Sequence, residues 1–424
     1  MIKKNYLAGD DQNHTLGFIF NFMKRGFYRV LFISFLSMSG CDKPADTLEK
    51  GNYNYDADFL KRHLHHVIEL SDERAQSKIL LTADFQGRVM TSTSNGDTGN
   101  SYGWINYELI ESREKKQQFN PVGGEERFWL GPEGGQFSFY FHSGDSFEIN
   151  NWQVPPLIDT ESFEVTETNA TSVTFSKKAS ITNYTGTPFD ILIERKISLL
   201  DKKGLESSLG VPLPGGIGYV GYQSDNQITN IGTADWKKET GLLSIWLLGM
   251  FTPSDQTTVI IPFKPISNAR QLITTTYFGE IPEDRISIQD SVLLFTCDGK
   301  YRSKIGLSPV IAKPLSASYD FEKNILTITK FEVTEEAPYV NSKWELQQEP
   351  YRGDAVNSYN DGPLADGSQL GPFYELESSS PALQLKAGDR AGYRQMTCHL
   401  EGDFEKLNYL SKKIVGVDLN KIKK

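Results

Sequence analysis

Carboxyl groups that could exchange protons with a ligand stand at three separate places in this chain, as Glu133, Asp361 and Glu377. Two carboxyl groups can act together as a general acid and a general base, and the distance between them decides which reaction they support. We therefore regard Glu377, paired with Glu133 or Asp361, as a candidate catalytic pair. A pocket holding only one of these carboxylates would instead favour ligand binding without catalysis.

The longest polar loop, residues 351–363, is dense in Asp, Asn, Tyr and Arg. Amide and carboxylate groups can form two hydrogen bonds at once, which matches the vicinal hydroxyls of a sugar. A run of Asx turns would explain the same composition, and the spacing does not match an EF-hand calcium loop. We favour a ligand-facing role because this loop is close in sequence to Glu377. The candidate binding residues in this region are Arg352, Asp354, Asn357, Asn360 and Glu375.

Residues 131–136, Gly-Pro-Glu-Gly-Gly-Gln, form a second candidate ligand loop. Glycines let a backbone approach a ligand closely, which would direct Glu133 and Gln136 into a site. A tight turn in which Glu133 caps backbone amides is the equal alternative. The segment lacks the lysine of a phosphate-binding loop and precedes a predicted strand, so we expect no nucleotide there. Neither a cofactor nor a metal site is indicated elsewhere.

Aromatic side chains supply the third element of a sugar site, because a pyranose ring stacks on Trp or Tyr. Trp152 lies in the loop-like segment 151–156 and is the best stacking candidate. Trp246 lies inside the apolar run 242–248, which predicts a core position.

The C-terminal run 371–389 resembles the closing hairpin of the galactose-mutarotase (aldose 1-epimerase) superfamily. There, a Leu-Glu pair precedes a loop and then a Leu-x-x-Gly-Asp run, present here as Leu385 to Asp389. The resemblance implies that Glu377 is the catalytic base. It also implies that Arg88, in the segment Gln86-Gly87-Arg88-Val89, lines a sugar pocket.

The chain departs from that family at the family's catalytic histidines. The nearest counterpart to the histidine-bearing strand is segment 223–230, which contains no His. This departure argues against ordinary mutarotase activity and leaves a non-catalytic sugar-binding protein as an alternative. As a whole the chain is similar to uncharacterised lipoproteins from Bacteroidota that carry the string found here at 127–136.

The elements that must position these residues are mostly strands. Short runs rich in β-branched and aromatic residues recur throughout the chain. They occupy residues 79–82, 87–91, 136–141, 173–175, 189–195, 242–248 and 258–261, and 319–329 is predicted to be a hairpin. Helical periodicity is confined to 57–70 and 404–424. We therefore predict one large two-sheet antiparallel β-sandwich, in agreement with the supersandwich fold that the resemblance implies.

The N-terminal region has the pattern of an export signal. Lys24 and Arg25 precede an apolar run at 30–36, which is too short to span a bilayer. The ending at 38–41 resembles a bacterial lipobox, which implies lipidation of Cys41 and a stable membrane anchor.

The resulting domain plan has three parts. We expect a signal peptide over 1–40, with the true start at Met23, then a lipid-anchored tether over 41–56 and a single β domain over 57–424. The protein would lie in the bacterial cell envelope, either in the periplasm or on the outer membrane.

Charge and cysteine content limit the partners. The net charge is −10 at pH 7, which disfavours nucleic-acid binding. Cys297 and Cys398 could form one bridge after export, but we expect each to be a small buried residue. We expect a monomer that binds carbohydrate and, in an enzymatic version, processes it as an epimerase or by glycoside chemistry. The alternative from another class is a structural or envelope-assembly lipoprotein.

Overall fold

The computed structural model describes residues 49–72 and 76–423, which fall within the compact unit Leu48–Lys424. The predicted signal peptide, Met23 start and Cys41 lie outside these residues. None of the described helices is long and apolar enough to cross a membrane. The helices are α1 (Tyr53–His63), α2 (Tyr107–Ser112), α3 (Pro156–Asp159), α4 (Lys202–Leu209) and α5 (Phe404–Ile414), with short 3₁₀ turns at Ala83–Phe85, Gly96–Thr98, Ala269–Leu272 and Leu419–Lys421.

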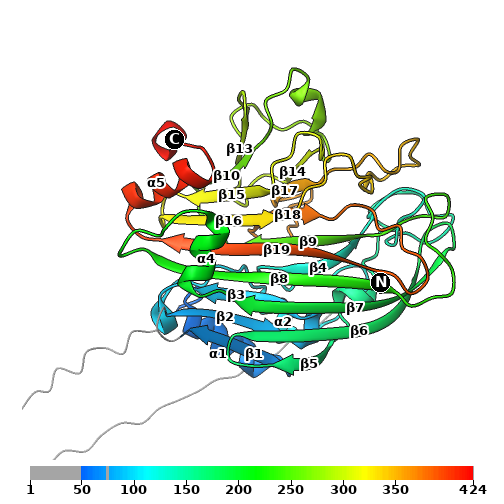
Figure 1. Cartoon of the computed structure of the whole chain (residues 1–424), viewed down its shortest axis with the longest axis horizontal. Helices are drawn as coiled ribbons and strands as arrows, with labels where there is room; N and C mark the ends of the chain where they lie inside the picture. The colour runs from blue at the N-terminus through cyan, green and yellow to red at the C-terminus, as the bar shows by residue number, and fades with distance from the viewer. Residues whose placement is uncertain (1–48, 73–75, 424) are drawn as a thin grey trace, which may run out of the picture. The chain divides into compact units, whose positions relative to one another are not determined.

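The strands of the described chain form three antiparallel sheets (Figure 1). The smallest sheet contains β1 (Val67–Asp72), β2 (Ser77–Thr82) and β3 (Arg88–Thr93). The six-stranded sheet has the order β11 (Ile273–Thr274), β14 (Ser303–Leu307), β17 (Val356–Asn360), β18 (Tyr374–Ser379), β9 (Ser244–Phe251) and β4 (Arg127–Gly131). The ten-stranded sheet has the order β12 (Ile286–Ile288), β13 (Val292–Thr296), β10 (Thr257–Pro262), β15 (Leu315–Asp320), β16 (Ile325–Phe331), β19 (Arg390–Glu401), β8 (Gly218–Asn230), β7 (Pro188–Leu199), β6 (Ser172–Thr182) and β5 (Glu164–Thr168).

The six-stranded and ten-stranded sheets pack face to face around the main core. Side chains at alternate positions of a strand point to opposite faces, so one face of each strand faces this core. In β18 the inward residues are Tyr374, Leu376 and Ser378, all of them buried. Tyr374 Oη lies 2.7 Å from Ser318 Oγ of the ten-stranded sheet. The outward residues of β18 are therefore Glu375 and Glu377.

Helices cover the other face of the ten-stranded sheet. Leu205 and Leu209 of α4, and Leu407 and Leu410 of α5, pack in one apolar cluster with strand residues such as Cys398. Figure 1 shows both helices lying over these strands. A further cluster joins α1 and α2 to the three-stranded sheet. The predicted mostly β fold built on two large antiparallel sheets is confirmed, and a third sheet of three strands accompanies them.

Cys297 and Cys398 are both free and buried. This confirms the expectation that each serves as a small core residue.

The helix predicted over 57–70 is wrong at both ends. Asn52 caps α1 by accepting a hydrogen bond from Asn54 N, so the helix begins at Tyr53. It ends at His63 because Leu64 is extended. Val67 and Ile68, which fitted a helical apolar face, pair instead with β2. β-branched residues pack well on a pleated sheet, and this tertiary pairing overrides the helical period.

Two further elements differ from prediction. Residues 136–141 contain no strand. The chain turns at 135–138, where Ser138 N donates to Gly135 O, and the loop side chains of Phe139, Tyr140 and Phe141 are buried. The C-terminal helix ends at Ile414 rather than continuing to 424. Gly416 has a φ of +84°, a conformation that a helix cannot contain and that glycine adopts without strain.

Candidate functional site

A cavity of about 830 Å³ lies against the outer face of the six-stranded sheet. Asn357 of β17 pairs with Glu377 of β18, and Glu377 pairs with Leu248 of β9. Trp246 is two residues from Leu248, and Lys304 pairs with Tyr359, two residues from Asn357. The two-residue period of strands therefore places Lys304, Asn357, Glu377 and Trp246 on one face.

Glu377 is buried in the floor of this region. Its Oε2 accepts hydrogen bonds from Lys304 Nζ at 2.9 Å and from Trp246 Nε1 at 3.0 Å. Its Oε1 has no hydrogen-bond partner within the part of the chain that the structure describes. A buried acceptor without a partner is costly, so this oxygen is a candidate acceptor for one further hydrogen bond.

Lys304 is surrounded by carboxylates. Burial alone would lower the pKa of Lys304, but attraction by Glu377, Glu133 and Glu375 outweighs it and raises that pKa. The ammonium group also lies 4.9 Å from the centre of the Trp246 ring, a cation–π contact. Lys304 therefore stays charged and forms an ion pair with Glu377.

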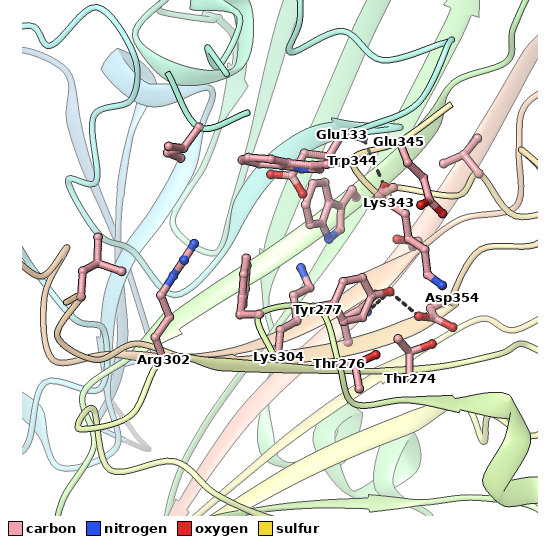
Figure 2. Close-up of a pocket in the computed structure, with 18 of the residues that line it drawn as sticks. Glu133, Thr274, Thr276, Tyr277, Arg302, Lys304, Lys343, Trp344, Glu345 and Asp354 are labelled. Atoms are coloured by element: carbon pink, nitrogen blue, oxygen red, sulfur yellow. Dashed lines mark hydrogen bonds between the residues drawn. The ribbon is translucent and has the colours of Figure 1, made fainter. Parts of the chain in front are cut away.

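Glu133 enters the cavity from the loop that follows β4. Figure 2 shows Glu133 and Trp344 facing Lys304 and Tyr277 across the cavity. Desolvation raises the pKa of Glu133, Lys304 opposes that shift, and repulsion from Glu377 adds to it. The Glu133 backbone N–H donates to Ser342 Oγ at 3.1 Å, which ties this loop to segment 341–349. The arrangement gives one carboxylate paired with Lys304, Glu377, and a second carboxyl group, Glu133, whose pKa is raised by burial.

Asp354 and Asn357 form the polar side of the cavity with Tyr277. The Tyr277 hydroxyl donates to Asp354 (Figure 2). Asn357 Nδ2 lies 3.4 Å from Tyr277 Oη. Desolvation raises the pKa of Asp354 to about 6, although the hydrogen bond from Tyr277 lowers it. Gly306 makes room for this pair, since a Cβ there would lie 2.0 Å from Asp354 Oδ2.

The candidates from the sequence divide into two groups. Glu133, Asp354 and Asn357 line the cavity, and Glu377 is bonded to its lining residues Lys304 and Trp246. Glu375 lies on the same face as Glu377 but is buried in an ion pair with Arg127. Desolvation raises the pKa of Glu375, and attraction by Arg127 opposes that shift.

The other candidates do not line the cavity. Asp361 is buried and accepts hydrogen bonds from Tyr359 Oη at 2.6 Å and Gly371 N at 3.0 Å. Asn360 points inward and bonds Gly299 N and Tyr301 O. Arg352 is exposed.

Three more candidates lie outside the cavity lining and contact neighbouring segments of the chain. Arg88 is buried and bonds Gly123 O and Gln86. Gln136 exchanges two hydrogen bonds of 2.9 Å with the backbone of Gln347, which fixes segment 341–349. Trp152 stacks behind Trp344, with ring centres 5.9 Å apart, so Trp344 rather than Trp152 presents its ring to the cavity.

The sequence did not single out Lys304, Arg302, Tyr277 or Trp344, and it assigned Trp246 to the core. Trp246 is indeed buried, but its N–H is directed to Glu377. One signal was present: Arg302 and Lys304 alternate with Ser303 and Ile305, which places two cations on one face of a strand.

Comparisons with solved structures give distant likenesses. A protein from Synechocystis sp. is 12% identical, with 80% of this chain and 96% of that chain covered and a TM-score of 0.47. A galactose mutarotase-like protein from Lactobacillus casei is 12% identical, with coverages of 79% and 99% and a TM-score of 0.46. A putative aldose 1-epimerase from Escherichia coli is 9% identical, with coverages of 78% and 98% and a TM-score of 0.46.

At the level of sequence, no curated protein matches the chain. One family does match, and it matches nearly all of the described residues, from 51 to 424. The chain therefore belongs to DUF6786, a family of unknown function.

Proposed function

We propose that this protein binds a saccharide in the cavity around Glu377. The observation that carries the proposal is the state of the Glu377 carboxylate. One of its oxygens is held by Lys304 and Trp246, while the other is buried without a partner among the described residues. A carboxylate fixed in this way can accept a sugar hydroxyl without paying further entropy to orient itself.

The remaining lining suits a polyol with apolar faces. Trp246, Trp344, Tyr277 and Phe278 supply aromatic rings, and Asp354 and Asn357 supply paired polar groups. Ligand sites in general combine an apolar lining with a few convergent polar groups, and the cavity volume lies in their usual range of roughly 300–1,000 Å³. A sugar ring presents C–H faces to the aromatic rings and hydroxyls to the polar side chains.

An enzymatic version of this function uses Glu133 as the acid and Glu377 as the base. Burial and repulsion from Glu377 raise the pKa of Glu133, which favours its protonated form, whereas Glu377 forms an ion pair with Lys304. Pairs of carboxyl groups whose surroundings separate their pKa values are suited to acid–base catalysis. Asp361, the other carboxyl considered for this role, does not line the cavity and is satisfied by Tyr359 and Gly371.

The test is a saccharide-binding screen of the purified protein beside a Glu377→Gln variant. Sugars that bind the parent protein should lose at least tenfold in affinity with the variant, because the amide has only one acceptor oxygen and no charge to pair with Lys304. Glu336→Gln, an exposed glutamate outside the cavity, is the matched control and should bind as the parent does. Binding that is indifferent to Glu377→Gln would place the sugar elsewhere, and no binding would favour a structural role. Turnover of any bound sugar, lost in Glu133→Gln, would identify an enzyme.

We also propose that the protein is an exported lipoprotein anchored through Cys41. The basic pair, apolar run and small residues before Cys41 support this proposal. Labelled fatty acid should be incorporated into the parent chain and not into a Cys41→Ser variant. Incorporation into both would contradict the assignment.

A further inference from the structure

Arg302 occupies one wall of the same cavity, two residues along the chain from Lys304. Arg302 directly precedes β14, and two residues of extended chain span about 7 Å. Figure 2 shows the Arg302 guanidinium extending into the space that Lys304 also enters. A second cation therefore lines the cavity that Lys304 also lines.

The guanidinium is held in place from two sides. Its Nε donates to Tyr359 Oη at 3.2 Å, and its plane lies 3.8 Å from the centre of the Phe278 ring. Tyr359 Oη in turn donates to Asp361 Oδ1 at 2.6 Å, and Asp361 is buried. Asp361 is thus a positioning residue, which orients Tyr359 and through it Arg302.

The two terminal nitrogens of Arg302 have no hydrogen bond or ion pair among the described residues. Nearby carboxylates are engaged elsewhere: Glu377 with Lys304, Asp354 with Tyr277, and Asp361 with Tyr359. Asp366, which also lines the cavity, is exposed and accepts hydrogen bonds from Ser368. A fixed guanidinium with both terminal nitrogens free is the geometry that receives a carboxylate or a sulfate through two parallel hydrogen bonds.

We propose that the cavity selects an acidic saccharide, in which Arg302 binds a carboxylate or sulfate ester and Glu377 accepts a hydroxyl of the same sugar or its neighbour. This inference rests on the proposed saccharide-binding function and names the ligand class of that site. Phe278 and Tyr359 fix the guanidinium before the ligand arrives, so little rotamer entropy remains to be lost on binding.

The test compares galactose and glucose with their uronates and their 6-sulfates by titration calorimetry. The parent protein should bind at least one acidic form about tenfold or more tightly than the neutral sugar, and this preference should shrink as salt is raised. Arg302→Gln should remove the preference while neutral sugars bind as before. Arg302→Lys should keep part of it, because the charge remains but the planar fork is lost. Arg62→Gln, on α1 and outside the cavity, is the control and should keep the full preference.

The outcomes separate the two proposals. The acidic sugar that binds more tightly, uronate or 6-sulfate, identifies the anionic group that Arg302 contacts. Either result supports the inference. Neutral and acidic sugars binding equally, both lost in Glu377→Gln, would overturn the role of Arg302 and leave the sugar site standing. A preference that survives Arg302→Gln would also overturn it. No binding of any of the six sugars to a folded parent protein would remove both proposals.

Discussion

Ser378 Oγ donates to Gln395 Oε1 over 2.7 Å, across the space between the two large sheets and directly behind Glu377. Gln395 Nε2 donates in turn to Glu126 Oε2 at 3.1 Å, and Glu126 pairs with the fully buried Arg195 at 3.0 Å. Ser378 points inward where Glu377 points outward. The polar chain through the core therefore fixes the position of the strand that carries Glu377.

Replacing Gln395 with Leu should loosen that strand. Ser378 and Glu126 would each lose a partner in a buried place, so the free energy of unfolding should fall by about 1–3 kcal/mol. Saccharide affinity should fall as well, although Gln395 does not touch the cavity. Chemical denaturation and calorimetry measure the two effects. Gln223→Leu, at a partly exposed position of β8, should change neither; full retention of affinity in Gln395→Leu would show that Glu377 is placed without this chain.

Removing Lys304 should break its buried ion pair with Glu377 and leave that carboxyl group without its cation. Breaking a buried ion pair from one side costs about 3–5 kcal/mol, so Lys304→Met should lower the free energy of unfolding by roughly 3 kcal/mol. Because Lys304 lowers the pKa of Glu133, its removal should also raise that pKa further. The double variant Lys304→Met with Glu377→Gln should recover most of the stability. A double variant no more stable than Lys304→Met would show that the ion pair is not the source of the loss.

The local part of the site could be predicted from the sequence, and the long-range part could not. Glu377, Asp354 and Asn357 lie in C-terminal segments whose composition marks them as polar and ligand-facing. Lys304 and Trp246 reach Glu377 from 73 and 131 residues away, through a strand order that no local pattern specifies. Pairing of distant strands is decided by the whole fold rather than by any one segment.

The alternation of side chains along a strand explains why two candidates that are close in sequence lie on opposite faces of the sheet. Asn357 and Asn360 are three residues apart on β17, so they point to opposite faces. Asn357 enters the cavity, whereas Asn360 turns inward and bonds the backbone of Gly299 and Tyr301. The polar composition of segment 351–363 predicted both as ligand residues because it did not show where the loop ends and the strand begins.

Stability should fall as pH rises from about 4 to about 6, in part because of Asp354. Desolvation raises its pKa from 3.8 to about 6 in the folded protein. Between these values the folded state keeps a proton that the unfolded state has lost, and above them the folded state must bury a charge. Asp354→Asn should therefore flatten the profile and raise the free energy of unfolding at pH 7.5 by about 1–3 kcal/mol. Denaturation at pH 4, 5.5 and 7.5 measures this.

A residual slope in Asp354→Asn is expected, because desolvation also raises the pKa of Asp159 to about 6, at a place outside the cavity. A profile identical to that of the parent would mean that Asp354 ionises normally in the folded protein.

The absence of a side chain at Gly306 should be required for Asp354 and Asn357 to keep their positions at the cavity. A Cβ at this position would lie 2.0 Å from Asp354 Oδ2 and 2.5 Å from Asn357 Nδ2, so Gly306→Ala must displace both side chains. We expect a loss of about 1–3 kcal/mol in the free energy of unfolding, the usual range for overpacking, and a saccharide affinity at least tenfold weaker. Gly215→Ala is the matched control, because a Cβ there meets no atom within 4 Å. Unchanged affinity in Gly306→Ala would mean that Asp354 and Asn357 do not contact the ligand, and would confine recognition to the Glu377 side of the cavity.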